Sequence, residues 1–199
     1  MKIKICGITN IDDAMYSIKK GADFIGVILD YTVKRHGTED LIVEIKNKSP
    51  ETKVVGVYTK FPDNELNEDY VQLHFPHNKN DIDYIKNKLN KNVISVINID
   101  NEDYRKKINE YMEAGSDYIL LEDKNGIYKD GDIINGINKY HIGLAGKISP
   151  DNVKNVLAME PELIDVSSSL EEYVGKKSLE KIDLFFKNAG DYNAIKQYK

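Results

Sequence analysis

Eight short apolar runs, separated by segments with helical periodicity, restrict most strongly what this chain can fold into. Strands that alternate with helices form parallel sheets, because each return crossing needs a helix-sized connection. Eight such units favour a closed (β/α)8 barrel over an open, doubly wound sheet. The runs are Ile3–Ile8, Phe24–Leu29, Lys53–Thr59, Tyr70–His74, Asn92–Ile99, Tyr118–Glu122, Tyr140–Ala145 and Leu163–Ser167.

The length of the chain places this barrel at the short end of its class. With 199 residues, one domain spanning residues 1–199 is long enough to bury a full core, and no segment has the composition of a linker. The connection Lys60–Asp69 is too short and too poor in apolar positions for a full helix. The sequence therefore predicts an α/β fold, a short TIM barrel with a reduced or missing third helix.

Apolar spacing and capping residues predict the other helices. Asp12 and Asp13 suit the positive end of the first helix, and Pro150 suits the first position of a helix opened by Ser149. The predicted helices are Asp12–Lys20, Thr38–Lys48, Asp81–Leu89, Glu102–Ala114, Pro150–Leu157 and Leu179–Asn188, with a weak one near Ile133–Ile137.

Composition excludes several classes of function. The net charge is −5 and lysine and glutamate are interleaved along most helices, so no basic stripe favours nucleic acid. The N-terminus has no long apolar run, which argues against a signal peptide or a membrane span. A single cysteine rules out an internal disulfide and a multi-cysteine metal site. We expect a cytoplasmic enzyme, either a monomer or a homodimer.

Cys6 occupies the most informative position in the chain. If Ile3 and Ile5 face one side of the first strand, Lys4 and Cys6 face the other, and Cys6 is the last side chain before the turn at Gly7. The carboxyl-terminal rim is where α/β barrels carry out chemistry. Cys6 is either a small buried hydrophobe or a proton acceptor whose pKa neighbouring charge has lowered.

Two acids end the sixth strand. Glu122 and Asp123 are adjacent, so at most one of them faces the interior of the barrel. Each is either a solvated acid at a strand end or a general acid.

Polar side chains also follow the second and fourth strands. Arg35, beside Lys34, is either a solvated loop cation or a fork for a carboxylate. Gln72 and His74 share one face of the fourth strand, where they are either polar filling of the barrel or part of a site. No second histidine lies at ligand spacing, so the sequence does not favour a metal.

The last two strands end in loops that suit a phosphate. Gly143–Lys147 and Asp165–Ser169 follow strands seven and eight, and barrels often bind phosphate at this corner through backbone N–H groups. Ordinary turn and capping chemistry is the alternative. Lys4 and Asp165 lie on the first and last strands, which are neighbours in a closed barrel, and we expect them to form a structural ion pair.

Several segments together resemble one family, phosphoribosylanthranilate isomerase. They occur in that family's order over nearly the whole chain, and KICGITN with VQLH is the specific combination. The segments are KICGITN (4–10), the loop residue Arg35, VQLH (71–74), ILLED (119–123), LAGKISPDNV (144–153) and DVSSSLEEYVGKK (165–177).

The resemblance implies an eight-stranded barrel that acts in tryptophan biosynthesis. The implied reaction is the Amadori rearrangement of N-(5-phosphoribosyl)anthranilate to its ribulose form, with no metal or organic cofactor. Cys6 would be the general base, the acid ending the sixth strand the general acid, and Arg35 the contact for the anthranilate carboxylate. Backbone groups of the last two loops would hold the phosphate.

This chain departs from the family pattern at several of these positions. Glu122 stands where the family has aspartate, and Asp123 is the fallback acid if the strand end bulges. Gly146 is followed by Lys147 in place of a second glycine, and the last loop reads Ser167–Ser169 in place of SSG. Glycine allows the backbone to come close to a phosphate, so the loss of these glycines restricts that approach. Lys147 would partly compensate for the loss as a point charge. Phe75 replaces a glycine after VQLH.

The sequence therefore predicts a small, phosphorylated substrate and a defined set of site residues. Cys6 and Glu122, with Asp123 in reserve, are the predicted catalytic pair. The predicted substrate-binding residues are Arg35, Gln72, His74, Gly146, Lys147, Ser168 and Ser169. Two alternatives stay open: a related barrel enzyme that acts on another sugar-phosphate, and a non-catalytic barrel that binds a ligand or partner.

Overall fold

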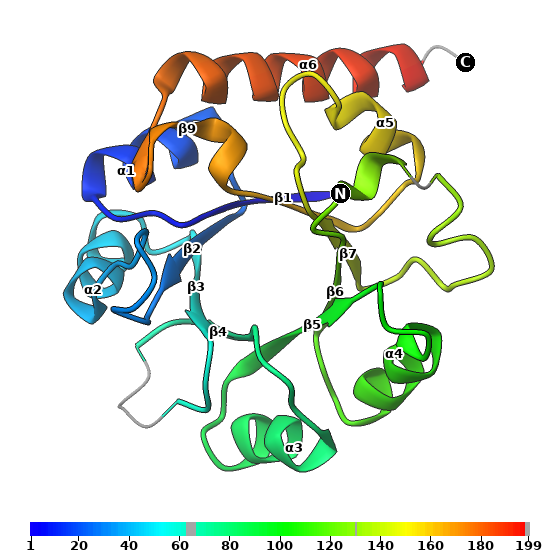
Figure 1. Ribbon diagram of the computed structural model, residues 1–199. Helices are drawn as coiled ribbons and strands as arrows, with labels where there is room; N and C mark the ends of the chain where they lie inside the picture. The colour runs from blue at the N-terminus through cyan, green and yellow to red at the C-terminus, as the bar shows by residue number, and fades with distance from the viewer. Residues whose placement is uncertain (63–66, 130, 198–199) are drawn as a thin grey trace.

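A computed structural model describes residues 1–62, 67–129 and 131–197 of the chain. Within this part, eight parallel strands form a closed barrel in sequence order, which confirms the predicted fold (Figure 1). Strand β1 pairs with β8 in parallel, and Lys4 lies opposite Asp165 in that register. The strands are β1 Lys2–Cys6, β2 Phe24–Ile28, β3 Lys53–Tyr58, β4 Tyr70–Leu73, β5 Asn92–Asn98, β6 Tyr118–Glu122, β7 Ile142–Ala145 and β8 Leu163–Val166.

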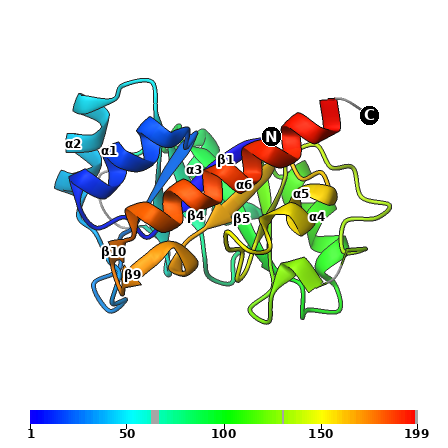
Figure 2. The same cartoon turned by 90° about the horizontal axis from the view of Figure 1, so that it is seen from above.

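Helices surround the barrel, and α6 lies against α1 and α5 (Figures 1 and 2). The Asn10 side chain accepts a hydrogen bond from Asp13 N at the start of α1, and Gly21 ends this helix with a φ of 110°. Thr38 caps α2 by accepting from Leu41 N. The helices are α1 Ile11–Lys20, α2 Glu39–Lys48, α3 Lys79–Asn87, α4 Tyr104–Glu113, α5 Val153–Ala158 and α6 Leu179–Gln197.

The helix predicted from Pro150 begins later, at Val153. The Asn152 side chain accepts from Ser149 N at 2.8 Å and donates to Lys147 O at 2.9 Å, so it holds the preceding residues in a turn. The weak helix predicted near 133–137 is also wrong, because these residues form turns. In the described part of the β6–β7 connection, only the short 3₁₀ helix Ile127–Lys129 is helical.

The connection from β3 to β4 contains no helix in its described residues, 59–62 and 67–69, and residues 63–66 lie outside the described part. Side-chain contacts hold its end instead. Asp69 accepts from Val54 N at 2.9 Å and from Lys46 Nζ at 3.1 Å. Glu68 is buried and accepts from Tyr58 Oη at 2.8 Å. These bonds tie the segment to β3 and α2 without a packed helix.

A small hairpin between β8 and α6 was not predicted from the sequence. Strands β9 (Glu171–Tyr173) and β10 (Lys176–Lys177) pair antiparallel after the 3₁₀ helix η2 (Ser168–Leu170). Figure 2 shows the hairpin beside the start of α6. It brings Glu171 and Lys177 close to the ends of β1 and β8.

Two layers of buried side chains follow from the alternation of residues along each strand. The larger apolar cluster, which includes Ile3 and Ile5, packs between the strands and the helices. A smaller cluster lies inside the barrel and includes Cys6, Phe24 and Leu120. Lys4 shares the face of Cys6, as predicted, and is also fully buried.

None of the described helices is long and apolar enough to cross a membrane.

Candidate active site

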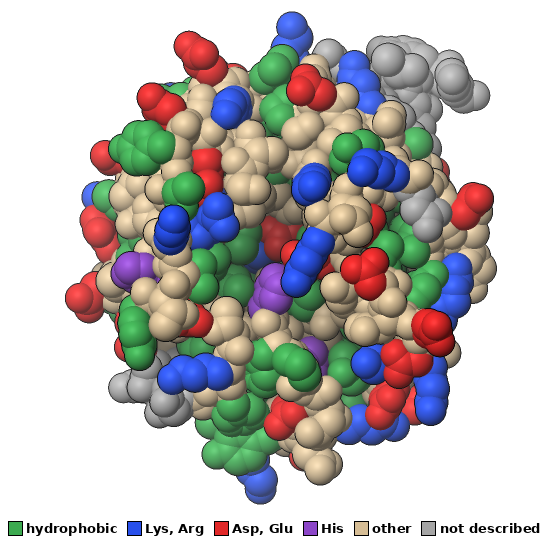
Figure 3. Space-filling view, viewed as in Figure 1, with side chains coloured by type: hydrophobic (Ala, Val, Ile, Leu, Met, Phe, Trp, Pro, Cys, Tyr) green, Lys and Arg blue, Asp and Glu red, His purple; other side chains and the backbone are tan. Residues whose placement is uncertain are grey.

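The carboxyl ends of the strands surround a cavity of about 220 Å³. Figure 3 shows the molecule hollowed at the centre of this face, with acidic, basic and histidine side chains around the hollow. Among the residues that line the cavity are Cys6, Arg35, Gln72, His74, Glu122, Gly146, Lys147, Ser168 and Ser169. These residues come from six different connections or strand ends, and each was a predicted site residue. The structure therefore brings the predicted set together.

Asp123, the fallback acid, does not line this cavity. The end of β6 carries no bulge, because Glu122 pairs with Ala145 and Asp123 N donates to Ala145 O at 3.2 Å. The Asp123 side chain turns away and accepts from Asn125 N at 2.6 Å. A Cβ on Gly146 would lie 1.9 Å from Asp123 O, so the backbone of the two loops is in direct contact. The bulge that would bring Asp123 into the position of Glu122 is therefore absent.

Cys6 lies at the end of β1, 6% exposed, with its side chain in the cavity wall. Burial raises the pKa of the Cys6 thiol, and the nearby ammonium of Lys4 offsets part of that rise. A buried thiol with a raised pKa is a strong proton acceptor once ionised, although it is ionised less often. The position suits a general base and also fits the smaller apolar cluster.

Glu122 lies at the end of β6 and contacts His74 across the rim. The distance from His74 Nε2 to Glu122 Oε2 is 3.3 Å. This hydrogen bond lowers the pKa of the Glu122 carboxyl, against the opposing effect of burial. At this distance, the carboxyl group and the imidazole are within reach of the same proton. Phe75 lines a neighbouring cavity beyond this pair.

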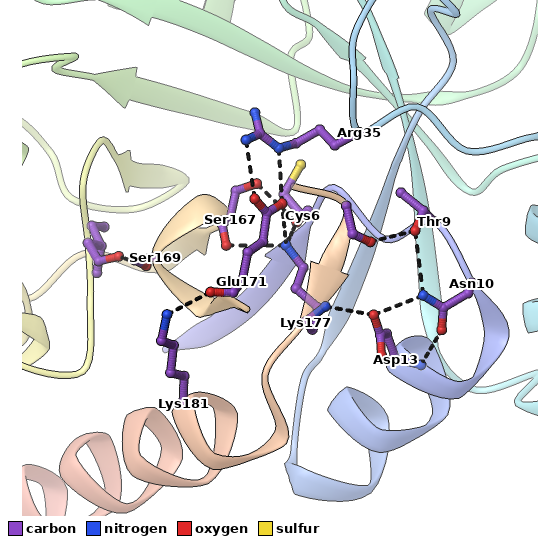
Figure 4. A network of polar contacts seen from close by, with 12 residues as sticks. Cys6, Thr9, Asn10, Asp13, Arg35, Ser167, Ser169, Glu171, Lys177 and Lys181 are labelled. Carbon is purple, nitrogen blue, oxygen red and sulfur yellow. Dashed lines mark hydrogen bonds and ion pairs between the residues drawn. The ribbon is translucent and has the colours of Figure 1, made fainter. Parts of the chain in front are cut away.

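Arg35 is held by an acid that the sequence analysis did not single out (Figure 4). Its Nε and Nη2 donate to Glu171 Oε1 and Oε2 at 3.0 and 3.2 Å, a bidentate fork. A Cβ on Gly7 would lie 2.8 Å from Arg35 Cδ, so this glycine gives the arginine its path over β1. Lys177 Nζ lies 3.5 Å from Glu171 Oε1. Glu171 and Lys177 both lie in the segment DVSSSLEEYVGKK (165–177). Only the β9–β10 hairpin shows that Glu171 pairs with Arg35 and Lys177.

Two buried acceptors in the cavity wall have no hydrogen-bond partner among the described residues. They are Gln72 Oε1 and Asp165 Oδ1, and both side chains are nearly inaccessible. Buried polar atoms are normally paired. Their position favours a site built for a ligand with several hydrogen-bond donors.

The loops after β7 and β8 meet at one corner of the cavity. Gly146 and Lys147 both have positive φ values, 114° and 49°, which turn the chain sharply there. The Ser169 hydroxyl donates to Ile148 O and joins the two loops. Lys147 and Ser168 are exposed at the mouth. A cation and small side chains in two joined loops are suited to an anionic group.

No group of three or more histidine, cysteine, aspartate or glutamate side chains is placed to hold a metal ion in the described ranges.

Comparison with known proteins identifies the family. The family model for N-(5′-phosphoribosyl)anthranilate isomerase matches residues 3–188. The chain belongs to this family. A Thermoplasma volcanium protein named N-(5′-phosphoribosyl)anthranilate isomerase is 42% identical over 197 residues, which cover 96% of this chain and 97% of that protein.

Solved structures of phosphoribosylanthranilate isomerases share the fold. The Thermotoga maritima enzyme superposes with a TM-score of 0.84 at 29% identity and covers 96% of this chain and 99% of its own. A phosphoribosylanthranilate isomerase structure in complex with reduced 1-(o-carboxyphenylamino)-1-deoxyribulose 5-phosphate gives a TM-score of 0.82 at 29% identity, with the same coverage. Membership of the family therefore rests on sequence and fold together.

Proposed function

We propose that this isomerase-family chain converts N-(5′-phosphoribosyl)anthranilate to 1-(2-carboxyphenylamino)-1-deoxyribulose 5-phosphate in tryptophan biosynthesis. The observation that carries the proposal is the meeting of Cys6, Glu122, Arg35 and Lys147 in one cavity. This substrate requires four functional groups in the site. They are a general acid, a general base, a guanidinium that binds the carboxylate through two hydrogen bonds, and a cation that binds the phosphate.

The proposed reaction begins with two proton transfers and ends with a tautomerisation, in which C1′ gains a proton and the C2′ hydroxyl loses one. Glu122 donates a proton to the ribose ring oxygen, and the ring opens to a Schiff base between C1′ and the anthranilate nitrogen. Cys6 then takes the C2′ proton, and the resulting enol amine tautomerises to the ketone. Gln72 and His74 are proposed to orient the sugar, because Gln72 Oε1 is an unpaired acceptor and His74 contacts Glu122.

The direct test is a steady-state fluorescence assay on freshly generated phosphoribosylanthranilate. We expect the purified protein to consume it and to form the ribulose product. Absence of turnover in the folded protein would overturn the proposal. Another phosphorylated sugar consumed in its place would favour the related sugar-phosphate enzyme, and binding without turnover would favour the non-catalytic barrel.

Arg35 is proposed to bind the anthranilate carboxylate. Glu171 accepts two of its N–H groups, and the guanidinium carries further donors that are free to meet a ligand. We expect Arg35→Lys to raise KM about 10-fold with a smaller change in kcat, because lysine keeps the charge and loses the fork. The control is phosphoribosylaniline, which lacks the carboxylate. Wild type and variant should bind it equally, and a matching loss on both substrates would contradict the role.

Lys147, with Gly146, Ser168 and Ser169, is proposed to hold the phosphate. We expect Lys147→Met to raise KM and the inhibition constant of inorganic phosphate by about 10-fold each, since one charge-assisted hydrogen bond to the phosphate is lost. Lys154→Met is the matched control, because Lys154 is exposed on α5 outside the cavity. Equal effects of both substitutions would point to general electrostatics and against a phosphate contact.

We also propose a cellular location and an oligomeric state for the protein. A biosynthetic role of this kind favours the cytoplasm, and we expect a monomer or a homodimer. Light scattering on the purified protein measures the mass directly.

A further inference from the structure

Lys4 is a lysine with no exposed side-chain surface, two residues before Cys6 on β1. Its ammonium lies 2.8 Å from Asp165 Oδ2 on the neighbouring strand β8, which confirms the predicted ion pair. Lys4 and Cys6 lie on the same face of β1, and both side chains are buried inside the barrel beside Gly26. Lys4 therefore links a buried carboxylate to the predicted base.

Gly26 on β2 provides the space for this contact. It lies opposite Cys6 in the register of β1 and β2. A Cβ added at Gly26 would lie 2.9 Å from Cys6 Sγ and 3.0 Å from Lys4 Nζ. Both atoms thus pack against the same bare stretch of backbone. A larger residue at this position would collide with both the sulfur and the ammonium.

Several charged groups surround the Cys6 sulfur. Lys4 comes from its own strand, Asp165 from β8, and Lys177 from β10, where Nζ donates to Cys6 O at 2.7 Å. The Arg35–Glu171 pair lies beyond Lys177. The two lysines lower the pKa of the Cys6 thiol, whereas Asp165 and burial raise it. Among these charged groups, Lys4 has the largest influence on the pKa of the Cys6 thiol.

We propose that Lys4 is a positioning residue that stabilises the thiolate form of Cys6 and holds its sulfur towards the cavity, while Asp165 keeps the ammonium charged and in place. The inference rests on the proposed function. In the proton abstraction, a thiolate lone pair takes the C2′ proton. The C2′–H electrons form the C1′=C2′ bond, and the C1′=N π electrons move to nitrogen. Lys4 stays protonated throughout, so it acts through Cys6 and does not exchange a proton with substrate.

Titration of thiolate absorbance near the ultraviolet maximum of the ion tests this directly. Cys6 is the only cysteine in the chain, so the signal belongs to one group. We expect Lys4→Met to raise the titration midpoint by at least about one pH unit, because a nearby buried opposite charge is removed. Lys2→Met is the matched control. Lys2 lies on the same strand with a half-exposed side chain paired to Asp23, and the midpoint should not move.

A double variant keeps the test decisive if Lys4→Met folds poorly, because the charge that pairs with Lys4 is removed together with it. The double variant Lys4→Met with Asp165→Asn leaves no unpaired charge behind. It should still raise the midpoint, by less than Lys4→Met alone, because Lys4 lowers the pKa of the thiol more than Asp165 raises it. Circular dichroism establishes that each variant is folded. An unchanged midpoint in the folded single or double variant overturns the proposal.

The titration needs no substrate, so the two proposals fail separately. If wild type shows isomerase activity, the ascending limb of its kcat/KM profile should move to higher pH in Lys4→Met by the same amount as the thiol midpoint. An unmoved limb and midpoint in an active enzyme would remove the role of Lys4 and leave the reaction standing. A shifted midpoint in a protein without isomerase activity would remove the reaction and keep the contact between Lys4 and the thiolate.

Discussion

Cys6→Ala should lower kcat of the isomerase reaction by about 10²- to 10⁴-fold, the usual contribution of a positioned general base. The side chain ends β1 in the cavity wall, and the cavity contains no other thiol. Alanine removes the proton acceptor and little volume, so the barrel should keep its fold. Steady-state kinetics with the fluorescent substrate measure the effect, and thermal unfolding checks the structure.

Alkylation gives an independent measure of the same role. Iodoacetamide should inactivate the enzyme with the pH dependence of the Cys6 titration, and saturating substrate should protect it. Cys6→Ser should also be strongly impaired, because an alcohol is far harder to ionise than a thiol. Cys6→Ala activity within about 10-fold of wild type would contradict the assignment, since general bases contribute more than that.

Glu122→Gln should be the second large loss, also about 10²- to 10⁴-fold in kcat. Glutamine keeps the length of the side chain and a hydrogen bond to His74, but it has no carboxyl proton to give to the ring oxygen. Asp123→Asn is the matched control. Its side chain is turned away from the cavity and bonded to Asn125 N, so kcat should stay close to wild type. A collapse in Asp123→Asn alone would place the acid at residue 123.

The acid should also show a distinct pH dependence. The His74 hydrogen bond lowers the pKa of Glu122, so the protonated acid becomes scarce as pH rises and kcat/KM should fall. In His74→Ala the hydrogen-bond donor is removed, the pKa of Glu122 rises, and the falling limb should move to higher pH. Glu122→Asp shortens the side chain and should lower kcat/KM by up to about 100-fold, because the carboxyl group is misplaced.

The local sequence pattern was sufficient to predict the barrel and to predict that most of the site residues lie close together. Apolar runs and helical spacing are properties of adjacent residues, so the eight strands were found with errors of only a few residues at their ends. Because the carboxyl ends of parallel strands meet at one rim, Cys6, Gln72 and Glu122 had to approach one another once the barrel was expected. The Lys4–Asp165 pair followed from the same closure.

Contacts between distant segments decided the rest. Arg35 and Glu171 lie 136 positions apart, and only the hairpin after β8 shows that they form a fork. The turn held by Asn152 makes α5 begin three residues later than predicted, at Val153. The regular pairing at the end of β6 keeps Asp123 out of the cavity. These outcomes depend on side-chain packing between elements, which no local periodicity encodes. The sequence by itself determined the barrel and the rim on which the chemistry lies; the tertiary structure decided which charges meet there, because burial and pairing set the protonation of each group.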